Sequence, residues 1–458
     1  MDVYAKKDSR TANYRVGDNV YDLIIRDGTI VRSSGRLVAD IAIEDGKVVY
    51  VGGNPAGGAK EEISGIGRFV MPGVIDANVY FRDANNPSKK TWKDGSREAL
   101  TGGVTTVLAM PESDDPSVDE DSIRAKLAVA GAESVVNFGV WAGSNASNLK
   151  DVGALWDAGL ICGTKVLMGD SGGASALEPD VLRQVFSKTK GLLGVHAEDQ
   201  DVLSSARTQN EGAANPVHNE LRPPEAAIRG VETLIELVKE SGRSVHLCHV
   251  STAGELTALD PYRDDLPITC EAAPQHLFLS IENAGNQGNL IKADPPIRTE
   301  LDRRAMLAAV KRGRIDAFAS SHSPYAMDTK KQDYWSVPSG IPGVGAMLPL
   351  LMGALKNGKI NLETLVAMCC ENPARIFNLE GKGHIEEGAD ADLLLFREGD
   401  TTKLTADMLG PHCGWSPYIG REVGVAPKLV VVNGVVAARD GVLTDKLPVG
   451  KPVTYTGR

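Results

Sequence analysis

The sequence predicts an α/β protein, and two features of the chain predict it. From about residue 73 to 380, short β-branched runs alternate with amphipathic stretches of helical period, which is typical of parallel strands connected by helices. At each end of the chain, β-rich runs separated by glycine-containing pairs replace that alternation. We therefore expect a (β/α)8, TIM-like barrel over residues 73–380 and a small β-sandwich formed by residues 1–72 together with 381–458.

The terminal segments have the pattern of antiparallel strands joined by tight turns. Apolar runs over residues 20–53 at one end, and over 389–396 and 428–443 at the other, are interrupted by residues that favour turns. The turn pairs are Asp27-Gly28, Ser34-Gly35, Asp45-Gly46, Asn433-Gly434 and Asp440-Gly441. The simplest arrangement pairs the two ends in one sandwich, with the glycine-rich residues 52–60 as a surface loop.

In the middle region, strand-like apolar runs alternate with stretches whose apolar residues recur at the period of a helix. Its strand-like runs are residues 104–110, 136–142, 163–168, 192–198, 244–250, 268–272 and 314–321. The clearest helices between them are expected over 178–190 and 222–242, the second closed by a glycine. In a barrel of this kind, chemistry lies at the carboxyl ends of the strands.

Composition and charge narrow the classes of function. A net charge of −11 argues against nucleic acid and anionic membranes as partners, because the overall field repels phosphates. The first residues lack the apolar core of a secretory signal, and no apolar run reaches the ~20 residues needed to cross a bilayer. Six scattered cysteines without a C-x-x-C pair are expected as reduced thiols. We expect a soluble, cytoplasmic protein.

A lysine and two histidines stand at the ends of three successive strand runs. They are Lys165, His196 and His249. Taken one at a time, each is readily structural, since a strand-end histidine is often only hydrogen-bonded and a lysine can extend to water. Taken together, two imidazoles and a lysine that has reacted with carbon dioxide to give a carbamate would supply three metal ligands. A fourth position would stay open for water.

Several longer motifs extend this pattern over nearly the whole chain. They are MPGVIDANVYFRD, ALTGGVTTVLAMP, ICGTKVLMGDSGG, VHAED, LCHVST, IKADPPIRTELDR, GRIDAFASSHSP, ENPARIFNL, GADADLLLF and HCGWSPYIGRE. With them the chain resembles the cyclic amidohydrolases, which include dihydroorotase, allantoinase and dihydropyrimidinase, and most of all the bacterial dihydroorotase branch. The resemblance implies hydrolysis of a C–N bond in a cyclic amide, imide or ureide by a metal-bound water.

The resemblance implies one zinc ion at most, where the family binds two metals. The family lysine that becomes a bridging carbamate matches Lys165, and the histidines of the second metal match His196 and His249. The ligands exclusive to the first metal are replaced by weaker ones. The family His-x-His of the first strand reads Asn78 and Tyr80, and the family aspartate that also carries the proton reads Ser321.

Of the positions that contact the substrate in this family, some are kept in this sequence and others are changed. Arg82 matches an arginine that pairs with a substrate carboxylate, a task that suits a planar guanidinium. Glu112 and Asp294 stand where the family has asparagines, and His276 is the remaining histidine of a family P-H-H-L motif. Two added carboxylates would repel dihydroorotate and favour a neutral or cationic ligand.

Three functions remain open on the sequence alone. The first is a mononuclear hydrolase with weak or altered activity, in which His322, Ser321 and Tyr80 are the candidates for catalysis and Glu112 or His322 for the base. The second is a catalytically inactive homologue that serves as a structural partner, for example of aspartate transcarbamoylase. The third is a metal-free binder or lyase. A homodimer or homotetramer is expected.

Overall fold

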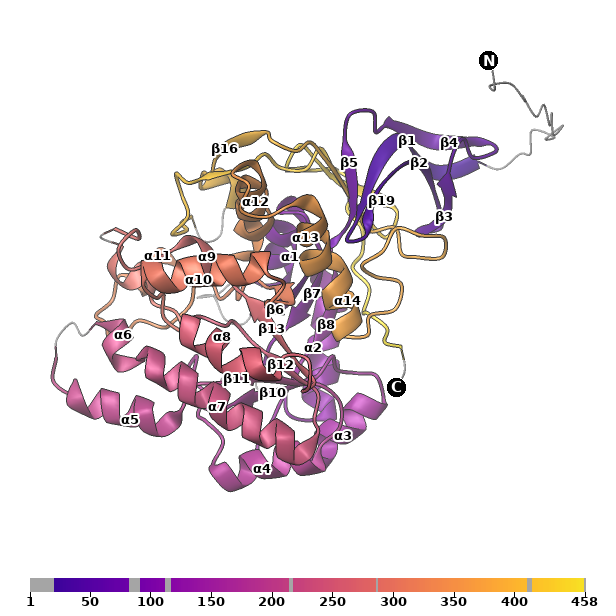
Figure 1. Cartoon of the computed structure of the whole chain (residues 1–458). Coiled ribbons are helices and arrows are strands. Elements are labelled where there is room, and N and C mark those ends of the chain that lie inside the picture. The colour runs from indigo at the N-terminus through magenta and orange to yellow at the C-terminus, as the bar shows by residue number, and fades with distance from the viewer. Residues whose placement is uncertain are drawn as a thin grey trace, which may run out of the picture.

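The computed structural model describes residues 20–81, 91–111, 117–213, 217–285, 287–409 and 414–456. Its centre is a parallel barrel, with a second, β-rich lobe beside it (Figure 1). None of the helices in these ranges is long and apolar enough to cross a membrane. The predicted fold class, a TIM-like barrel with a terminal β-sandwich, is confirmed.

The barrel strands follow the predicted runs closely. They are β6 (Val74–Val79), β7 (Val104–Ala109), β8 (Asn137–Val140), β9 (Ala142–Gly143), β10 (Thr164–Leu167), β11 (Leu193–His196), β12 (Val245–Leu247), β13 (Ile268–Ala272) and β14 (Ala317–Phe318). They pair in parallel in the orders β6-β7-β8 and β9-β10-β11-β12-β13-β14. Because β8 and β9 are two parts of one strand interrupted at Trp141, the nine described segments make eight barrel strands.

The barrel closes between its first and last strands. The backbone N–H of Tyr80 donates to the carbonyl of His322 (2.9 Å), and the N–H of His322 donates to the carbonyl of Asn78 (3.2 Å). Inside the barrel, Asp76 adds a side-chain link, since its Oδ1 accepts the N–H of Ser320 at 2.9 Å. These contacts place residues 76–80 beside residues 320–322 in the interior of the barrel.

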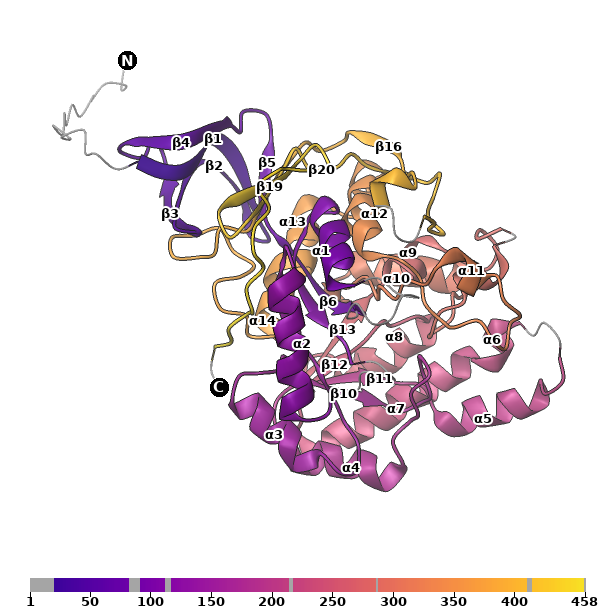
Figure 2. The same cartoon turned by 180° about the vertical axis from the view of Figure 1, so that it is seen from behind.

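Helices surround the barrel on the outside, as Figures 1 and 2 show from opposite sides. The α-helices are α1 (Trp92–Thr101), α2 (Glu120–Glu133), α3 (Leu149–Asp157), α4 (Pro179–Lys188), α5 (Gln200–Gln209), α6 (His218–Leu221), α7 (Pro224–Ser241), α8 (Ala253–Leu259), α9 (Pro274–Phe278), α10 (Glu300–Lys311), α11 (Met327–Lys330), α12 (Val344–Lys356), α13 (Leu362–Val366) and α14 (Asn372–Ile376). Shorter helical turns are η1 (Asp260–Tyr262), η2 (Gly288–Ile291), η3 (Ala367–Glu371) and η4 (Asp407–Leu409).

The sequence encodes the ends of these helices locally. Helix α7 has a proline in its first turn and ends at Gly242, whose φ of 67° suits a residue without a side chain. Helix α8 begins with a capping box, in which the Thr252 side chain and the Glu255 side chain each bond the other's backbone N–H. Helix α7 therefore ends at a fixed point just before strand β12, and α8 starts at a fixed point just beyond it.

The two ends of the chain meet in one sheet. Its strands are β1 (Val20–Arg32), β2 (Gly35–Glu44), β3 (Lys47–Gly52), β4 (Gly58–Ser64), β5 (Phe69–Pro72), β15 (Leu393–Phe396), β18 (Leu429–Val432), β19 (Val435–Arg439) and β20 (Val442–Leu443). Strand β5 pairs with β15, where Val70 lies opposite Leu395. The order is β20-β19-β18-β15-β5-β1-β2-β3, with β4 beside β1, and β16 (Thr401–Lys403) pairs separately with β17 (Glu422–Gly424).

Two local predictions in this lobe are wrong. Asp27-Gly28 is no turn between strands but a bulge inside β1, where Asp27 has a φ of 53° and the pairing with β2 shifts its register. The glycine-rich residues 52–60 are a loop only in part, because β4 begins at Gly58 and pairs in parallel with β1. An Asp-Gly pair has the same left-handed preference in a bulge as in a hairpin turn.

The cysteines are placed as reduced thiols in the interior. The described ones, all buried and none in a disulfide bond, are Cys162, Cys248, Cys270, Cys369 and Cys370. Cys413 lies outside the described residues.

Candidate active site

The structure brings Lys165, His196 and His249 together at the carboxyl ends of three neighbouring strands. Lys165 lies on β10, His196 ends β11, and His249 lies two residues beyond β12. The side chains are buried, with exposed fractions of 6%, 1% and 4%. The Lys165 Nζ lies 3.1 Å from the Sγ of Cys248, the residue next to His249.

The two imidazoles face each other through one nitrogen each. His196 Nδ1 and His249 Nε2 are 3.3 Å apart. Two Zn–N bonds of about 2.0–2.1 Å at a tetrahedral angle would separate their nitrogens by about 3.3–3.4 Å. The pair therefore fits one zinc ion, with Lys165 as the adjacent third side chain.

Both histidines are held in the neutral form that binds metal. Burial lowers the pKa of His196, an effect only partly opposed by its hydrogen bond with Glu198. Burial is the main cause that lowers the pKa of His249 well below its ordinary value, and the neighbouring Lys165, and His196 whenever it is protonated, disfavour a second positive charge there. Glu198 Oε2 lies 2.9 Å from His196 Nε2, so the ionised carboxylate accepts that proton and the lone pair of Nδ1 faces His249.

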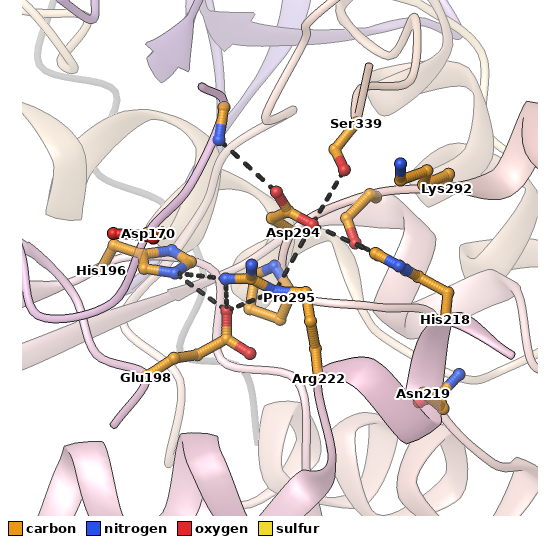
Figure 3. A network of polar contacts seen from close by, with 12 residues as sticks. Asp170, His196, Glu198, His218, Asn219, Arg222, Lys292, Asp294, Pro295 and Ser339 are labelled. Carbon is orange, nitrogen blue, oxygen red and sulfur yellow. Dashed lines mark hydrogen bonds and ion pairs between the residues drawn. The ribbon is translucent and has the colours of Figure 1, made fainter. Parts of the chain in front are cut away.

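Arg222 connects this centre to the neighbouring wall of the site (Figure 3). Arg222 forms an ion pair with Glu198. Its Nε also lies 3.4 Å from Oδ1 of Asp294. Burial alone would raise the pKa of Glu198, but the charge of Arg222 and the hydrogen bond from His196 lower it to about 2. Glu198 is therefore a carboxylate at neutral pH and orients His196.

The charge of Asp294 is compensated inside the protein. Ser339 Oγ donates to Oδ1 at 2.9 Å, and His218 Nε2 lies 3.2 Å from the same oxygen. Burial would raise the pKa of Asp294, but the charge of Arg222 and the hydrogen bond from His218 outweigh it and hold the pKa well below its usual range. The predicted repulsion of an acidic substrate by Asp294 is therefore largely cancelled by Arg222.

The Asn78 side chain, predicted to stand where the family has a first-metal ligand, is hydrogen-bonded to another protein group. Asn78 Nδ2 donates to Oε1 of Glu271 (2.8 Å), which also accepts the backbone N–H of His249 (3.3 Å). Glu271 Oε2 lies 3.1 Å from Nε2 of His246. Burial would raise the pKa of Glu271, but these contacts lower it, so the carboxylate remains ionised.

Tyr80 and Ser321 lack the properties of the ligands they replace. Burial raises the pKa of Tyr80 far above its ordinary value, so its phenol keeps the proton. Ser321 lies in the left-handed region with a φ of 49° and is a neutral hydroxyl. Among the described residues, no group of three His, Cys, Asp or Glu side chains is arranged to hold a metal, so the candidate site depends on Lys165.

A cavity of about 210 Å³ opens at this end of the barrel. Tyr80, Lys165, Asp294 and Ser321, all predicted from the sequence, contribute to its wall. The rest of the described wall is mostly uncharged and comes from Pro111, Val118, Gly143, Ser144, Asn145, Leu167, Ser171, Gly172, Ala174, Ser175, Leu177, Gln275, Ala293, Ser323, Tyr325, Ser339, Gly340 and Ile341. The described wall does not include His196 or His249, so Lys165 is the one of these three side chains that contributes to the described wall.

Two predicted residues do not face this cavity. His322 turns toward helix α12, where its Nδ1 accepts the backbone N–H groups of Gly343 (3.0 Å) and Val344 (3.1 Å). That nitrogen cannot also act as a base, and His322 is outside the described wall of the cavity. His276 is likewise buried behind the wall, with Nε2 3.3 Å from the carbonyl of Pro295, and burial lowers its pKa to about 4.

Arg82 and Glu112, predicted to contact substrate, lie outside the described residues. Sequence analysis missed Glu198, Arg222 and Glu271. A signal was present for two of them. Glu198 follows His196 by two residues and Glu271 ends a strand run, positions where an acid can orient a ligand. Arg222 gave no comparable signal, because it lies outside the strand ends.

The comparisons with known proteins identify the family of the chain. A family model described as the amidohydrolase family matches residues 69–437. A dihydroorotase from Halobacterium salinarum is 36% identical over 90% of this chain and 95% of its own length. An allantoinase from Rubrobacter xylanophilus is 33% identical over 88% of this chain and 91% of its own.

The solved structures give the same result. The L-hydantoinase (dihydropyrimidinase) from Arthrobacter aurescens superposes with a TM-score of 0.89 and 28% identity, covering 95% of this chain and all (100%) of that one. The family model, the relatives and the fold together define the class of cyclic amidohydrolases. The chain belongs to the amidohydrolase family, among the cyclic amidohydrolases. The resemblance found in the sequence is confirmed.

Proposed function

We propose that this protein hydrolyses a C–N bond of a neutral cyclic amide, imide or ureide with one metal ion. His196, His249 and Lys165, the last as a carbamate, would hold the ion. The observation that carries the proposal is the 3.3 Å separation of His196 Nδ1 and His249 Nε2, which fits two ligands of one tetrahedral zinc. Zinc in such a site supplies Lewis acidity, lowering the pKa of water and polarising a carbonyl oxygen.

The side chains of the protein have separate roles in this proposal. Glu198 and Arg222 keep the His196 ring oriented. Tyr80, protonated and in the cavity wall, is a hydrogen-bond donor to a ring carbonyl. Ser321 cannot remove a proton at neutral pH as the family aspartate does, a role worth about 10²–10⁴-fold in rate. We therefore propose weak activity.

The proposed substrate is uncharged because the described cavity wall has little net charge to offer. Its acid, Asp294, is paired with Arg222 and His218, and its amine, Lys165, is assigned to the metal. Burying a charged group without a partner costs several kcal/mol. The remaining wall of hydroxyl, amide and apolar groups suits a small neutral ring.

Metal content tests the proposal directly. Protein purified with zinc and bicarbonate is expected to contain about one zinc per chain, measured by inductively coupled plasma mass spectrometry. His249→Asn and Lys165→Met should each reduce that content strongly, whereas the matched control His384→Asn, at an exposed position, should not. Only trace metal, with no uptake on zinc supplementation, would refute the proposal. Turnover is then measured with a cyclic imide and with dihydroorotate, and the imide is expected to react faster.

A second candidate function is that of an inactive assembly partner. It is favoured by the hydrogen bond of Asn78 to Glu271 and by Ser321, which together leave the first-metal position without family ligands. In this case the chain would bind another enzyme, for example an aspartate transcarbamoylase, as a structural subunit. Co-purification of a stable partner without any imide turnover would support it, and a homo-oligomer with turnover would exclude it. A cytoplasmic homodimer or homotetramer is part of the first proposal.

A further inference from the structure

Gln275 is a buried polar side chain for which the fold provides no partner. It lies on α9, is 3% exposed and contributes to the cavity wall. Its Oε1 is buried and has no hydrogen-bond partner within the described ranges. A buried amide oxygen that stays unpaired is destabilising, and most such groups in folded proteins are satisfied. An unpaired amide oxygen on a residue of a cavity wall indicates a side chain that a ligand completes.

The backbone around Gln275 is fixed, so the side chain starts from a defined point. Its carbonyl accepts the N–H of Leu279 at 3.1 Å. The carbonyl of Leu277 accepts from Nη1 of Arg303 at 3.1 Å, which ties α9 to α10. Pro274 begins the helix at the position where proline is best tolerated. Tyr80 and Ser321 belong to the same cavity wall.

We propose that Gln275 recognises the amide edge of the substrate ring through two hydrogen bonds. The inference rests on the proposed function, because it specifies how a cyclic amide is selected. In a five- or six-membered ring the amide is fixed in the cis form, so its N–H and C=O point to the same side. A glutamine side chain carries the complementary pair, an acceptor Oε1 and a donor Nε2. Oε1, which is covered in the structure, turns toward the cavity to accept the ring N–H, and Nε2 donates to the ring carbonyl.

The experiment compares two probes that differ only at the ring nitrogen, glutarimide and N-methylglutarimide. Glutarimide has a single N–H, so methylation removes the donor on both of its edges. Affinities are measured by calorimetry on the purified full chain, for the wild type and for Gln275→Leu. Gln209→Leu, at an exposed position on α5, is the matched control. Gln275→Glu keeps an acceptor and loses the donor, with little change in volume.

The wild type and Gln209→Leu are expected to prefer glutarimide by about 10- to 100-fold, the range for one buried hydrogen bond that is lost. In Gln275→Leu the preference should fall to about one, mainly through weaker binding of glutarimide, which loses both hydrogen bonds. Gln275→Glu should weaken glutarimide binding while it keeps part of the preference. Thermal unfolding of each variant shows whether it is folded.

An unchanged preference in folded Gln275→Leu would overturn the inference, and so would a wild type that binds neither probe at millimolar concentration. The proposed function can fail separately. A preference that depends on Gln275, without any hydrolysis, would retain this inference and reject the hydrolase. Hydrolysis with a preference independent of Gln275 would do the reverse.

Discussion

Ser321 is the residue at which the chemistry of this site departs most from the resembling family. Its φ of 49° is a conformation that aspartate adopts more readily than most residues. Ser321→Asp is therefore expected to fold and to raise kcat/KM for a neutral cyclic imide by about 10²–10⁴-fold, the usual contribution of a positioned base. The control is Ser323→Asp, in the same cavity wall. Equal rates for the two variants would show that a missing base does not limit the reaction.

Asp76 predicts a pH dependence of stability. Burial raises its pKa to about 7, while an unfolded aspartate has a pKa of about 3.9. Between these values the folded state holds a proton that the unfolded state has released, so stability falls as pH rises from about 4 to 7 and is level above. Asp76→Asn removes this titration. The decrease in unfolding free energy between pH 5 and pH 8 should therefore be smaller in Asp76→Asn than in the wild type, by roughly 2.5–3 kcal/mol.

Urea unfolding at the two pH values measures the effect of Asp76→Asn, since both proteins can be compared at fixed temperature. Asp151→Asn, at an exposed position on α3, is the control and should leave the wild-type pH dependence unchanged. If Asp76→Asn also leaves it unchanged, Asp76 is ionised in the folded protein at both pH values.

The start of helix α12 is capped by the side chain of His322, which follows the last barrel strand. Its first N–H groups, those of Gly343 and Val344, donate to His322 Nδ1, and such groups have no partner inside the helix. His322→Leu should lower the free energy of unfolding by about 1–3 kcal/mol, the cost of unsatisfied buried donors. His322→Asn can place an acceptor near the same point and should lose less. Chemical denaturation of both variants checks the order, which would be reversed or absent if His322 had no such structural role.

Sequence periodicity predicted the barrel elements because burial alone determines their pattern. Strands β10, β11 and β12 lie within the predicted runs, and with them Lys165, His196 and His249 come together. The role of His322 could not be predicted, because it depends on the direction its side chain takes after the left-handed Ser321. Nor could the compensation of Asp294, since Arg222 approaches it from a segment 72 residues earlier in the chain (294 − 222). Such orientations are set by tertiary contacts rather than by local pattern.

At the scale of the molecule, a buried charge cluster joins the β-rich lobe to the barrel. Lys382 Nζ donates to Asp392 at 2.6 Å and lies 2.8 Å from Asp390. Asp392 also accepts from Nδ2 of Asn137 on β8 (2.9 Å) and from the N–H of Asn433 between β18 and β19 (2.8 Å). The side chain of one aspartate thus contacts both structural units.

Removing the cation of this cluster should destabilise the whole protein. Lys382→Met leaves the buried Asp392 without its counter-ion, while Asp390 keeps its ion pair with Lys47 (2.6 Å), and is expected to cost about 3–5 kcal/mol. Lys428→Met, which breaks an exposed pair with Asp440 (2.6 Å), is the control and should cost less than about 1 kcal/mol. Differential scanning calorimetry compares the two. Similar shifts in Tm would mean that the cluster does not join the two units energetically.

The buried cysteines allow local and global opening of the protein to be measured by thiol labelling. A thiol reagent can reach Cys248, beside Lys165, or Cys369 and Cys370, in the η3 turn, only when the surrounding structure separates. Labelling rates measured at each position by mass spectrometry therefore give the frequency of local or global opening. A ligand or metal that binds at Lys165 should slow labelling of Cys248 more than labelling of Cys369. The difference between the two rates shows which part of the molecule the binding stabilises.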